Sequence, residues 1–148
     1  MFKSMLKAMV SAMVFMYRLT GGGIGGKMQN MPVLLLTTTG RKSGKSRTVP
    51  LGYLKDGADY VVIASYAGQP RHPAWFLNLQ SHPEATIQVK RSQMQVKAET
   101  AKPEKRRELW ARLVEVSPGY AKYQERTTRK IPLVILHPVD DRGEPTSV

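Results

Sequence analysis

The sequence predicts a mainly β fold with helices in the gaps, an α+β arrangement of about six mostly antiparallel strands that close into a small closed or split β-barrel, preceded by an N-terminal amphipathic helix. Three observations support it. The 148 residues fit one compact domain, and 41% hydrophobic and 23% charged residues are typical of a globular protein. Short strand-like runs recur along the chain, two of them joined by an Asp56-Gly57 turn. This much antiparallel pairing disfavours a sheet of alternating strands and helices.

The first predicted element is an amphipathic helix over residues 1–20, where methionines recur every three or four positions. Its apolar stretch, from Ala8 to Tyr17, is about half the roughly twenty residues that a membrane-spanning helix needs. No small-residue cleavage site follows, so a secretion signal is not predicted. Such a basic, Met-rich helix can contact an anionic membrane through residues 1–19, pack on a second subunit, or pack on its own domain. The sequence leaves these three alternatives open.

A glycine-rich linker is predicted over residues 21–30, because five of the six residues in 21–26 are glycine and offer little surface for packing. We expect a flexible joint that lets the helix move independently. The barrel domain is predicted over residues 31–139 and a flexible polar tail over 140–148.

Alternating and continuous apolar runs predict the elements of the barrel domain. Strands are expected over residues 32–39, 48–55, 59–66, 84–90, 94–98 and 131–137, and helices within 70–83, from Pro103 to Val116, and over 120–126. Pro50 interrupts the second strand and has no backbone donor. We therefore expect an edge or a bulge there, with a gap in the hydrogen-bond ladder that a ligand could approach.

The charge is strongly basic, with 23 Lys and Arg against 11 Asp and Glu and a formal net charge of +12. An anionic partner is therefore expected. The segment 40–47 is the best candidate, because four of its eight residues are basic, two are glycine and two are serine. Glycine lets backbone amides turn toward an anion, while Arg, Lys and Ser donate hydrogen bonds. The alternative is a solvated, charged hairpin turn.

Several classes of chemistry lack their usual residues. The chain has no cysteine, which excludes disulfides, thiolate metal sites and a cysteine nucleophile. His72, His82 and His137 are far apart and show no metal-ligand spacing, so no metal site is predicted. There is no Gly-x-Ser-x-Gly motif and no carboxylate pair in an apolar context, so hydrolysis has no obvious catalyst.

A series of short motifs resembles a known family over about residues 31–138. They are Thr38-Thr39-Gly40-Arg41-Lys42-Ser43-Gly44, Arg47, Pro50-Leu51, Ala64-Ser65, Pro73-x-Trp75-x-x-Asn78-Leu79, Pro118-Gly119-Tyr120-x-x-Tyr123-Gln124 and Thr128-x-x-Ile131-Pro132. In this order and spacing the chain resembles the deazaflavin-dependent nitroreductases, which use reduced coenzyme F420. The resemblance implies a split barrel of the FMN-binding type. F420 has a flavin-shaped ring joined through a phosphodiester to an oligoglutamate tail, which suits a basic protein.

The resemblance also implies a cofactor site. Lys42 and Arg47 would bind phosphate or tail carboxylates, with Arg41, Ser43 and Lys45 beside them. Pro50 would abut the ring, and the backbone of Ile63, Ala64 and Ser65 would run along its edge with strand amides exposed to it. Trp75 and Asn78 would complete the wall.

On the substrate side, the resemblance places Tyr120 and Tyr123 over the reactive face of the ring, with Ser65 and Tyr66 nearby. Ser65, Tyr120 and Tyr123 are the catalytic candidates, since a phenol can stack on a planar acceptor and donate a hydrogen bond or a proton. Some relatives carry tyrosine at the position of Ser117 and a basic residue at that of Tyr66. Ser117 and Tyr66 therefore join the predicted substrate contacts. The departure at Ser117 bears on substrate preference, and the departure at Tyr66 bears on how the cofactor tail is held.

The resemblance implies hydride transfer from reduced F420 to a quinone, a nitroaromatic or a conjugated lactone of the coumarin or aflatoxin type. One alternative is the same barrel with FMN, and another is a non-enzymatic basic barrel that binds nucleic acid or a membrane surface. Against nucleic acid, aromatic residues are only 7% and no strand alternates basic with aromatic residues. We expect a cytoplasmic monomer or homodimer that does not bind nucleic acid, associated with the inner face of the cell membrane if the N-terminal helix contacts lipid.

Overall fold

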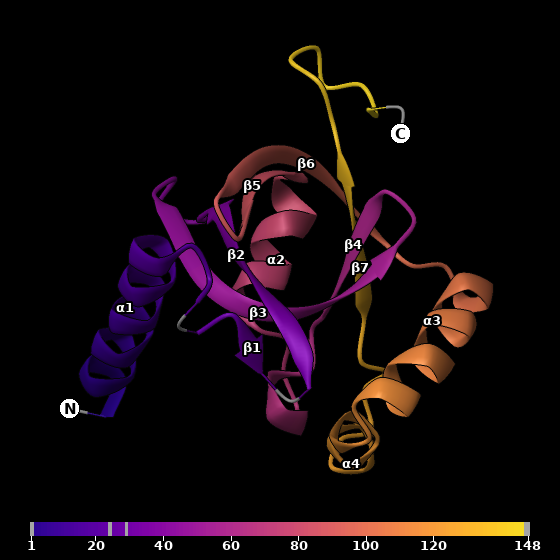
Figure 1. Ribbon diagram of the computed structural model, residues 1–148. Helices are drawn as coiled ribbons and strands as arrows, with labels where there is room; N and C mark the ends of the chain where they lie inside the picture. The colour runs from indigo at the N-terminus through magenta and orange to yellow at the C-terminus, as the bar shows by residue number, and fades with distance from the viewer. Residues whose placement is uncertain (1, 24, 29, 147–148) are drawn as a thin grey trace.

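The computed structural model describes residues 2–23, 25–28 and 30–146, and its centre is a closed antiparallel β-barrel (Figure 1). In order around the barrel the strands are β2 (Met31–Thr39), β3 (Ser46–Asp56), β4 (Asp59–Ile63), β7 (Leu133–Pro138), β6 (Ser92–Thr100) and β5 (Glu84–Val89). Pairing of β5 with β2 closes the ring. The short strand β1 (Lys27–Met28), which the sequence did not predict, pairs with the start of β2. The six-stranded barrel confirms the predicted fold class.

Helices lie around and across this barrel. They are α1 (Phe2–Thr20), α2 (Ala74–Ser81), α3 (Pro103–Val116) and α4 (Gly119–Glu125), with the single turn η1 (Tyr66–Gly68) after β4. Figure 1 shows α1 on one side of the barrel and α3 with α4 on the opposite side. Within the described part of the chain, no helix is long and apolar enough to cross a membrane.

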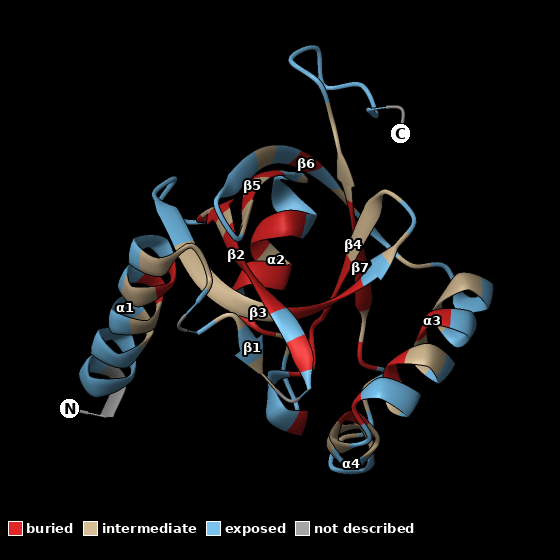
Figure 2. Cartoon of the chain, viewed as in Figure 1, coloured by how far each residue is buried: buried red, intermediate tan, exposed pale blue. Residues whose placement is uncertain are grey.

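The strand β2 is buried on both faces, which explains its continuous apolar run. Leu34 and Leu36 face the interior cluster, while Val33 and Leu35 face outward and are covered by α1. Figure 2 shows this burial in red along the central strands. A half-exposed strand would instead alternate apolar and polar residues.

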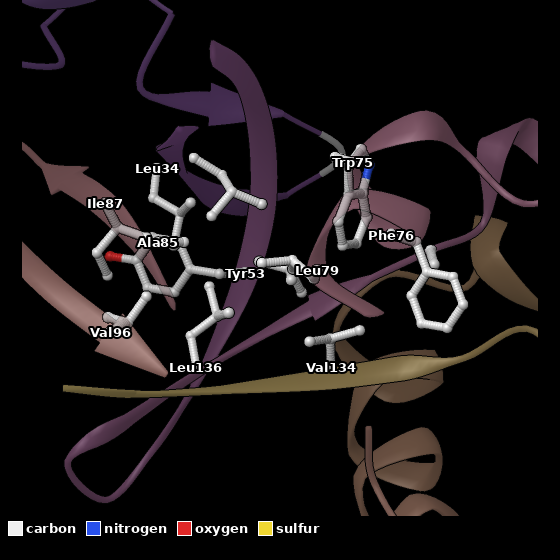
Figure 3. Packing of buried hydrophobic residues seen from close by; sticks show 13 residues of the cluster. Leu34, Tyr53, Trp75, Phe76, Leu79, Ala85, Ile87, Val96, Val134 and Leu136 are labelled. Carbon is white, nitrogen blue, oxygen red and sulfur yellow. The ribbon is translucent and has the colours of Figure 1, made fainter. Parts of the chain in front are cut away.

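The interior core is filled partly by α2, whose apolar residues point between the strands (Figure 3). Trp75 and Phe76 pack edge to face, with ring centroids 6.3 Å apart, and Leu79 lies among strand residues such as Val134 and Leu136. On the outside of the barrel, α3 contributes the fully buried Leu109 and Leu113 to a second cluster. These two layers fix α2 and α4, which carry the predicted site residues.

The helix α1 is fixed to the barrel by Tyr17, which is 1% exposed. The Tyr17 hydroxyl donates to the Val33 carbonyl at 2.8 Å and accepts from the Lys90 amide at 2.8 Å. The expectation of an independently moving helix is therefore wrong, because these bonds and the packing of Val14 hold it after the glycine run. Of the three alternatives for α1, packing on its own barrel is the one that holds for the face that carries Val14 and Tyr17.

Two polar clusters lie away from the predicted site. Asp56 binds Lys105 and Arg112 of α3, at 3.1 and 2.9 Å. His137 lies between Asp59 and Glu99, each 2.9 Å away. The predicted tail forms an exposed turn over residues 140–146, in which the Asp140 carboxylate accepts two backbone amides, and residues 147–148 lie outside the described residues.

Candidate active site

A basic cavity of about 360 Å³ lies between the loop after β2 and the start of α2. Arg41, Lys42, Ser43 and Arg47 line it on one side, and Trp75 and Asn78 of α2 line it on another. All four loop residues are exposed, and no carboxylate among the described residues lies within 4.0 Å of these three cations. The cavity therefore presents unpaired cations and a hydroxyl to an anion.

The loop around this cavity is held by hydrogen bonds from α2. The buried Asn78 donates from its amide nitrogen to the Thr38 hydroxyl at 3.0 Å, and its oxygen accepts the Arg41 amide at 3.0 Å. Gly40 cannot be replaced freely, because a Cβ there would lie 2.8 Å from the Ser43 hydroxyl. Asn78 thus lines the basic cavity, as the resemblance implied, but its polar atoms are engaged in positioning the loop.

A second cavity, of about 490 Å³, adjoins the first and is lined mainly by apolar and aromatic residues, with no charged residue among the described ones. The two share Val49, Ala74 and Trp75 in their walls. Pro50 and Leu51 of β3 form one side, while Ser65 and Tyr66, Tyr120 and Tyr123, and Ile63 complete it. The predicted residues Pro50 of β3, Ile63 at the end of β4, Trp75 of α2, and Tyr120 and Tyr123 of α4 therefore line one opening.

The opening exists because the β3–β4 ladder ends early. The last pair is Tyr53 with Val62, so the half of β3 that contains Pro50 pairs only with β2. Pro50 therefore lies where β3 has one partner, as its missing donor predicted.

After β4 the chain makes a turn in left-handed backbone conformation. Tyr66, Ala67 and Gly68 have φ values of 47°, 54° and 78°. The expected strand to residue 66 therefore ends at Ile63. Left-handed backbone at a non-glycine residue costs about 1 kcal/mol or more, and such strain persists only where the surroundings impose it.

Arg129 holds this turn. Its guanidinium donates to three main-chain carbonyls, those of Ala64 at 3.1 Å, Ser65 at 2.7 Å and Gln69 at 2.9 Å, and also bonds His72 at 3.2 Å. Burial lowers the pKa of His72, and the Arg129 charge lowers it further, so the imidazole is neutral and accepts this bond. Arg129 was not among the predicted site residues, since nothing in the sequence distinguishes it from ten other arginines.

The two tyrosines of α4 lie edge to face at the wall of the apolar cavity, with ring centroids 5.6 Å apart. Tyr120 is 7% exposed, and burial raises its pKa to about 12, with a further contribution from Tyr123. Its hydroxyl lies over Gly52, 3.7 Å from where a Cβ would be. Tyr120 is therefore a neutral phenol over the working range of a protein, suited to donate a hydrogen bond.

Two predicted residues lie differently from expectation. Ser117 is 3% exposed at the end of α3 and is absent from the described walls of both cavities. Ala64 is fully buried, its amide donates to the Pro132 carbonyl at 3.0 Å and its carbonyl accepts from Arg129. The Ala64 amide is thus not exposed toward the cavity, because it is bonded to the segment just before β7.

A split barrel with an unpaired basic cavity beside an apolar, tyrosine-lined one defines an oxidoreductase that binds a planar anionic cofactor. Comparison with known proteins identifies which kind. The profile of the F420H(2)-dependent quinone reductase family matches residues 9–138. The chain belongs to this family, so its cofactor is F420, and the FMN alternative is not supported.

Individual relatives agree. An F420H(2)-dependent quinone reductase of Mycobacterium tuberculosis is 40% identical over 124 residues, covering 81% of this chain and 83% of the relative. The solved structure of an F420-H2 dependent reductase, FDR-A, aligns with a TM-score of 0.65 at 39% identity, covering 71% of this chain and 93% of that one. A structure described as a domain-swapped dimer aligns with a TM-score of 0.66 at 39% identity, covering 71% of this chain and 79% of that one.

Proposed function

We propose that this protein reduces quinones with F420H2, binding the cofactor's phosphodiester in the basic cavity and its ring in the apolar cavity. The observation that carries this proposal is the shared wall of Val49, Ala74 and Trp75, which joins the two cavities. The donor chemistry fits, since Lys42, Arg47 and the Ser43 hydroxyl suit a phosphodiester. Pro50, Leu51 and Trp75 offer apolar surface to a planar ring.

The reduced cofactor supplies a hydride. A quinone that accepts it also needs a proton, and its carbonyl oxygen gains negative charge as the hydride arrives. Tyr120, neutral because its pKa is about 12, donates a hydrogen bond to that oxygen. Tyr123 and Tyr66 stack on the planar acceptor, and Ser65 donates a second hydrogen bond at the cavity wall.

Fluorescence titration of the purified protein with F420 and, separately, with FMN tests the cofactor assignment. We expect F420 to bind more tightly, and Lys42→Ala or Arg47→Ala to weaken it about tenfold at low salt, because each removes a contact to the anion. Lys45→Ala is a matched control in the same loop, outside the described cavity wall. Equal binding of F420 by the Lys42, Arg47 and control variants would contradict the site.

The acceptor range is set by a cavity lined by tyrosines on one side and apolar groups on the other. Nitroaromatics and conjugated lactones of the coumarin or aflatoxin type are planar and have an electron-poor centre, so they join quinones as proposed acceptors. Steady-state rates with one compound of each class, for the wild type and Tyr120→Phe, test this. A uniform fall in kcat with an unchanged KM is expected where the hydroxyl acts only in the transition state.

We further propose that α1 contacts an anionic membrane surface from the cytoplasm. Its outward side carries exposed apolar residues, Met5, Met9 and Leu19, opposite the face that packs on the barrel, and the exposed Phe15 lies beside them at the edge of the cavity between α1 and β3. Sedimentation with anionic liposomes, comparing wild type with Met9→Ser/Phe15→Ser, tests this better than deletion of the helix, which would expose Val33 and Leu35. Unchanged partition of the variant would refute it.

The relative described as a domain-swapped dimer supports a homodimer as the proposed assembly. Light scattering after size exclusion measures the mass directly. A mass of 16.6 kDa across the concentration range would show a monomer instead.

A further inference from the structure

One residue from the N-terminal part of the chain lines the apolar cavity. Among the described residues of its walls, Met28 alone precedes β2, and the others come from β3 and later segments. Met28 is the second residue of the two-residue strand β1 and is half-buried. Neither the sequence patterns nor the family resemblance indicated it. Met28 is therefore a wall residue to which no function has yet been assigned.

Met28 belongs to the Tyr120 side of the apolar cavity. In the β1–β2 register it pairs with Met31, whose Cβ lies 3.6 Å from where a Cβ of Gly52 would be. The Tyr120 hydroxyl lies 3.7 Å from the same point. The basic cavity adjoins elsewhere, at the three wall residues that the two cavities share, and Met28 is not among the described residues that line it. The acceptor, whose carbonyl is proposed to bind the Tyr120 hydroxyl, is therefore the ligand nearer to Met28.

The strand β1 is fixed on both sides, so Met28 has a defined place in the wall. The Val33 amide donates to the Gly26 carbonyl at 3.0 Å, and the Val33 carbonyl accepts the Tyr17 hydroxyl at 2.8 Å. One residue of β2 thus holds the chain before and after the glycine run. Between β1 and β2, Asn30 has a φ of 64°, a left-handed conformation that asparagine adopts more readily than most residues. The backbone of Met28 is therefore set by α1 and β2.

The side chain of Met28 offers the cavity an adaptable apolar surface. It packs against the outer cluster that α1 forms with β2, so it lies between the cavity and this cluster. Methionine is unbranched and polarisable and fits apolar groups of different shapes. It has no hydrogen-bond donor, so it cannot bind the carbonyl oxygens of an acceptor. The group that suits Met28 is an alkyl substituent on the acceptor ring.

We propose that Met28 is a specificity-determining residue of the acceptor site, which contacts an alkyl substituent of a quinone and so favours alkyl-substituted acceptors over unsubstituted ones. This inference rests on the proposed function and deepens it, because it names the residue that discriminates among quinones. The substituent takes no part in hydride transfer, so its contact with Met28 is the same in the bound substrate and in the transition state. Such a contact acts on KM and leaves kcat unchanged.

Steady-state rates with F420H2 and two naphthoquinones test this, one without a substituent on the quinone ring and one with a short alkyl chain there. The proteins are wild type, Met28→Ala, Met28→Gln and Met28→Leu, with Met94→Ala as the matched control. Met94 is another half-buried methionine, but it lies on β6 and packs against the interior cluster. Because the alkyl chain also changes the reduction potential of the quinone, each variant is compared with wild type on the same acceptor. Glutamine keeps the length of the side chain but ends in an amide, whereas leucine keeps an apolar side chain of similar volume.

We expect Met28→Ala and Met28→Gln to raise the KM for the alkyl-substituted quinone about tenfold, the effect of losing contact with one or two methylene groups in an apolar pocket. The KM for the unsubstituted quinone, kcat with both quinones and the affinity for F420 should stay within about twofold of wild type. Met28→Leu and Met94→Ala should keep the wild-type preference.

An equal rise in KM for both quinones would overturn the inference, because a merely structural role of β1 affects both. An unchanged KM in Met28→Ala and Met28→Gln would overturn it as well, while leaving the proposed function intact. Failure of wild type to reduce either quinone would instead refute the proposed function, and this inference with it.

Discussion

Replacing Arg129 by methionine tests whether the left-handed turn at the apolar cavity depends on one side chain. The guanidinium donates to three carbonyls and is half-buried. A hydrogen bond to a charged group contributes about 1.5 to 3 kcal/mol, and the three bonds share one side chain, so they do not add fully. We expect Arg129→Met to lower the free energy of unfolding by about 2 to 4 kcal/mol, or the midpoint of thermal unfolding by about 6 to 12 °C in a chain of this size.

Urea unfolding followed by circular dichroism measures the loss of stability, and F420 titration measures the effect on the site. Arg129→Lys is the matched control, because it keeps the charge but cannot reach three carbonyls with one planar fork. We expect the lysine variant to recover less than half of the lost stability, and both variants to bind F420 more weakly, since the turn that carries Ser65 and Tyr66 is released. Wild-type stability and F420 affinity in Arg129→Lys would refute the argument.

Three further predictions concern stability. Gly68→Ala should lower the free energy of unfolding in urea by more than about 2 kcal/mol, since a Cβ would lie 2.6 Å from a backbone oxygen of α4. Gly44 also has a positive φ but has open space around it, so Gly44→Ala should cost only about 1 kcal/mol. Tyr17→Phe should cost about 1 to 3 kcal/mol in the same assay, because it leaves the Lys90 amide without its partner. Burial alone would lower the pKa of His137, but the hydrogen bonds that its ring nitrogens donate to the carboxylates of Glu99 and Asp59 outweigh burial and raise the pKa above 6.5. The wild type should therefore lose stability relative to His137→Gln as pH rises from 6.5 through the raised pKa, and a pH-independent difference would refute this.

The sequence predicted the barrel because its signals are local. Alternation, turn residues and proline positions indicated all six barrel strands and the later helices. The two-residue strand β1 was too short to produce a pattern. The docking of α1 was missed because it depends on hydrogen bonds from Tyr17 to residues 16 and 73 positions away, which outweigh the flexibility of the glycine run.

The site, like the fold, could be predicted only where its residues belong to local sequence patterns. The composition of the loop after β2 indicated an anion site, and the motif resemblance placed Pro50, Trp75, Tyr120 and Tyr123 around one opening. Arg129 could not be found, because its role arises from carbonyls of a turn more than 55 residues away in sequence. Ser117 was assigned because some relatives carry tyrosine at its position, but at the end of α3 this side chain is buried, outside the described walls of both cavities.

The opening of the barrel has two independent causes that act at the same place. In the register of β3 and β4, where Tyr53 faces Val62, a longer β4 would bring Ser65 opposite Pro50 and cover the cavity wall. Pro50 has no amide proton to offer such a partner, which weakens the closed alternative. The left-handed turn, held by Arg129, moves the chain away before that pairing can form. Pro50→Ala should therefore leave the cavity open and weaken F420 binding only through the apolar surface it loses, whereas loss of Arg129 should release the turn and weaken binding more.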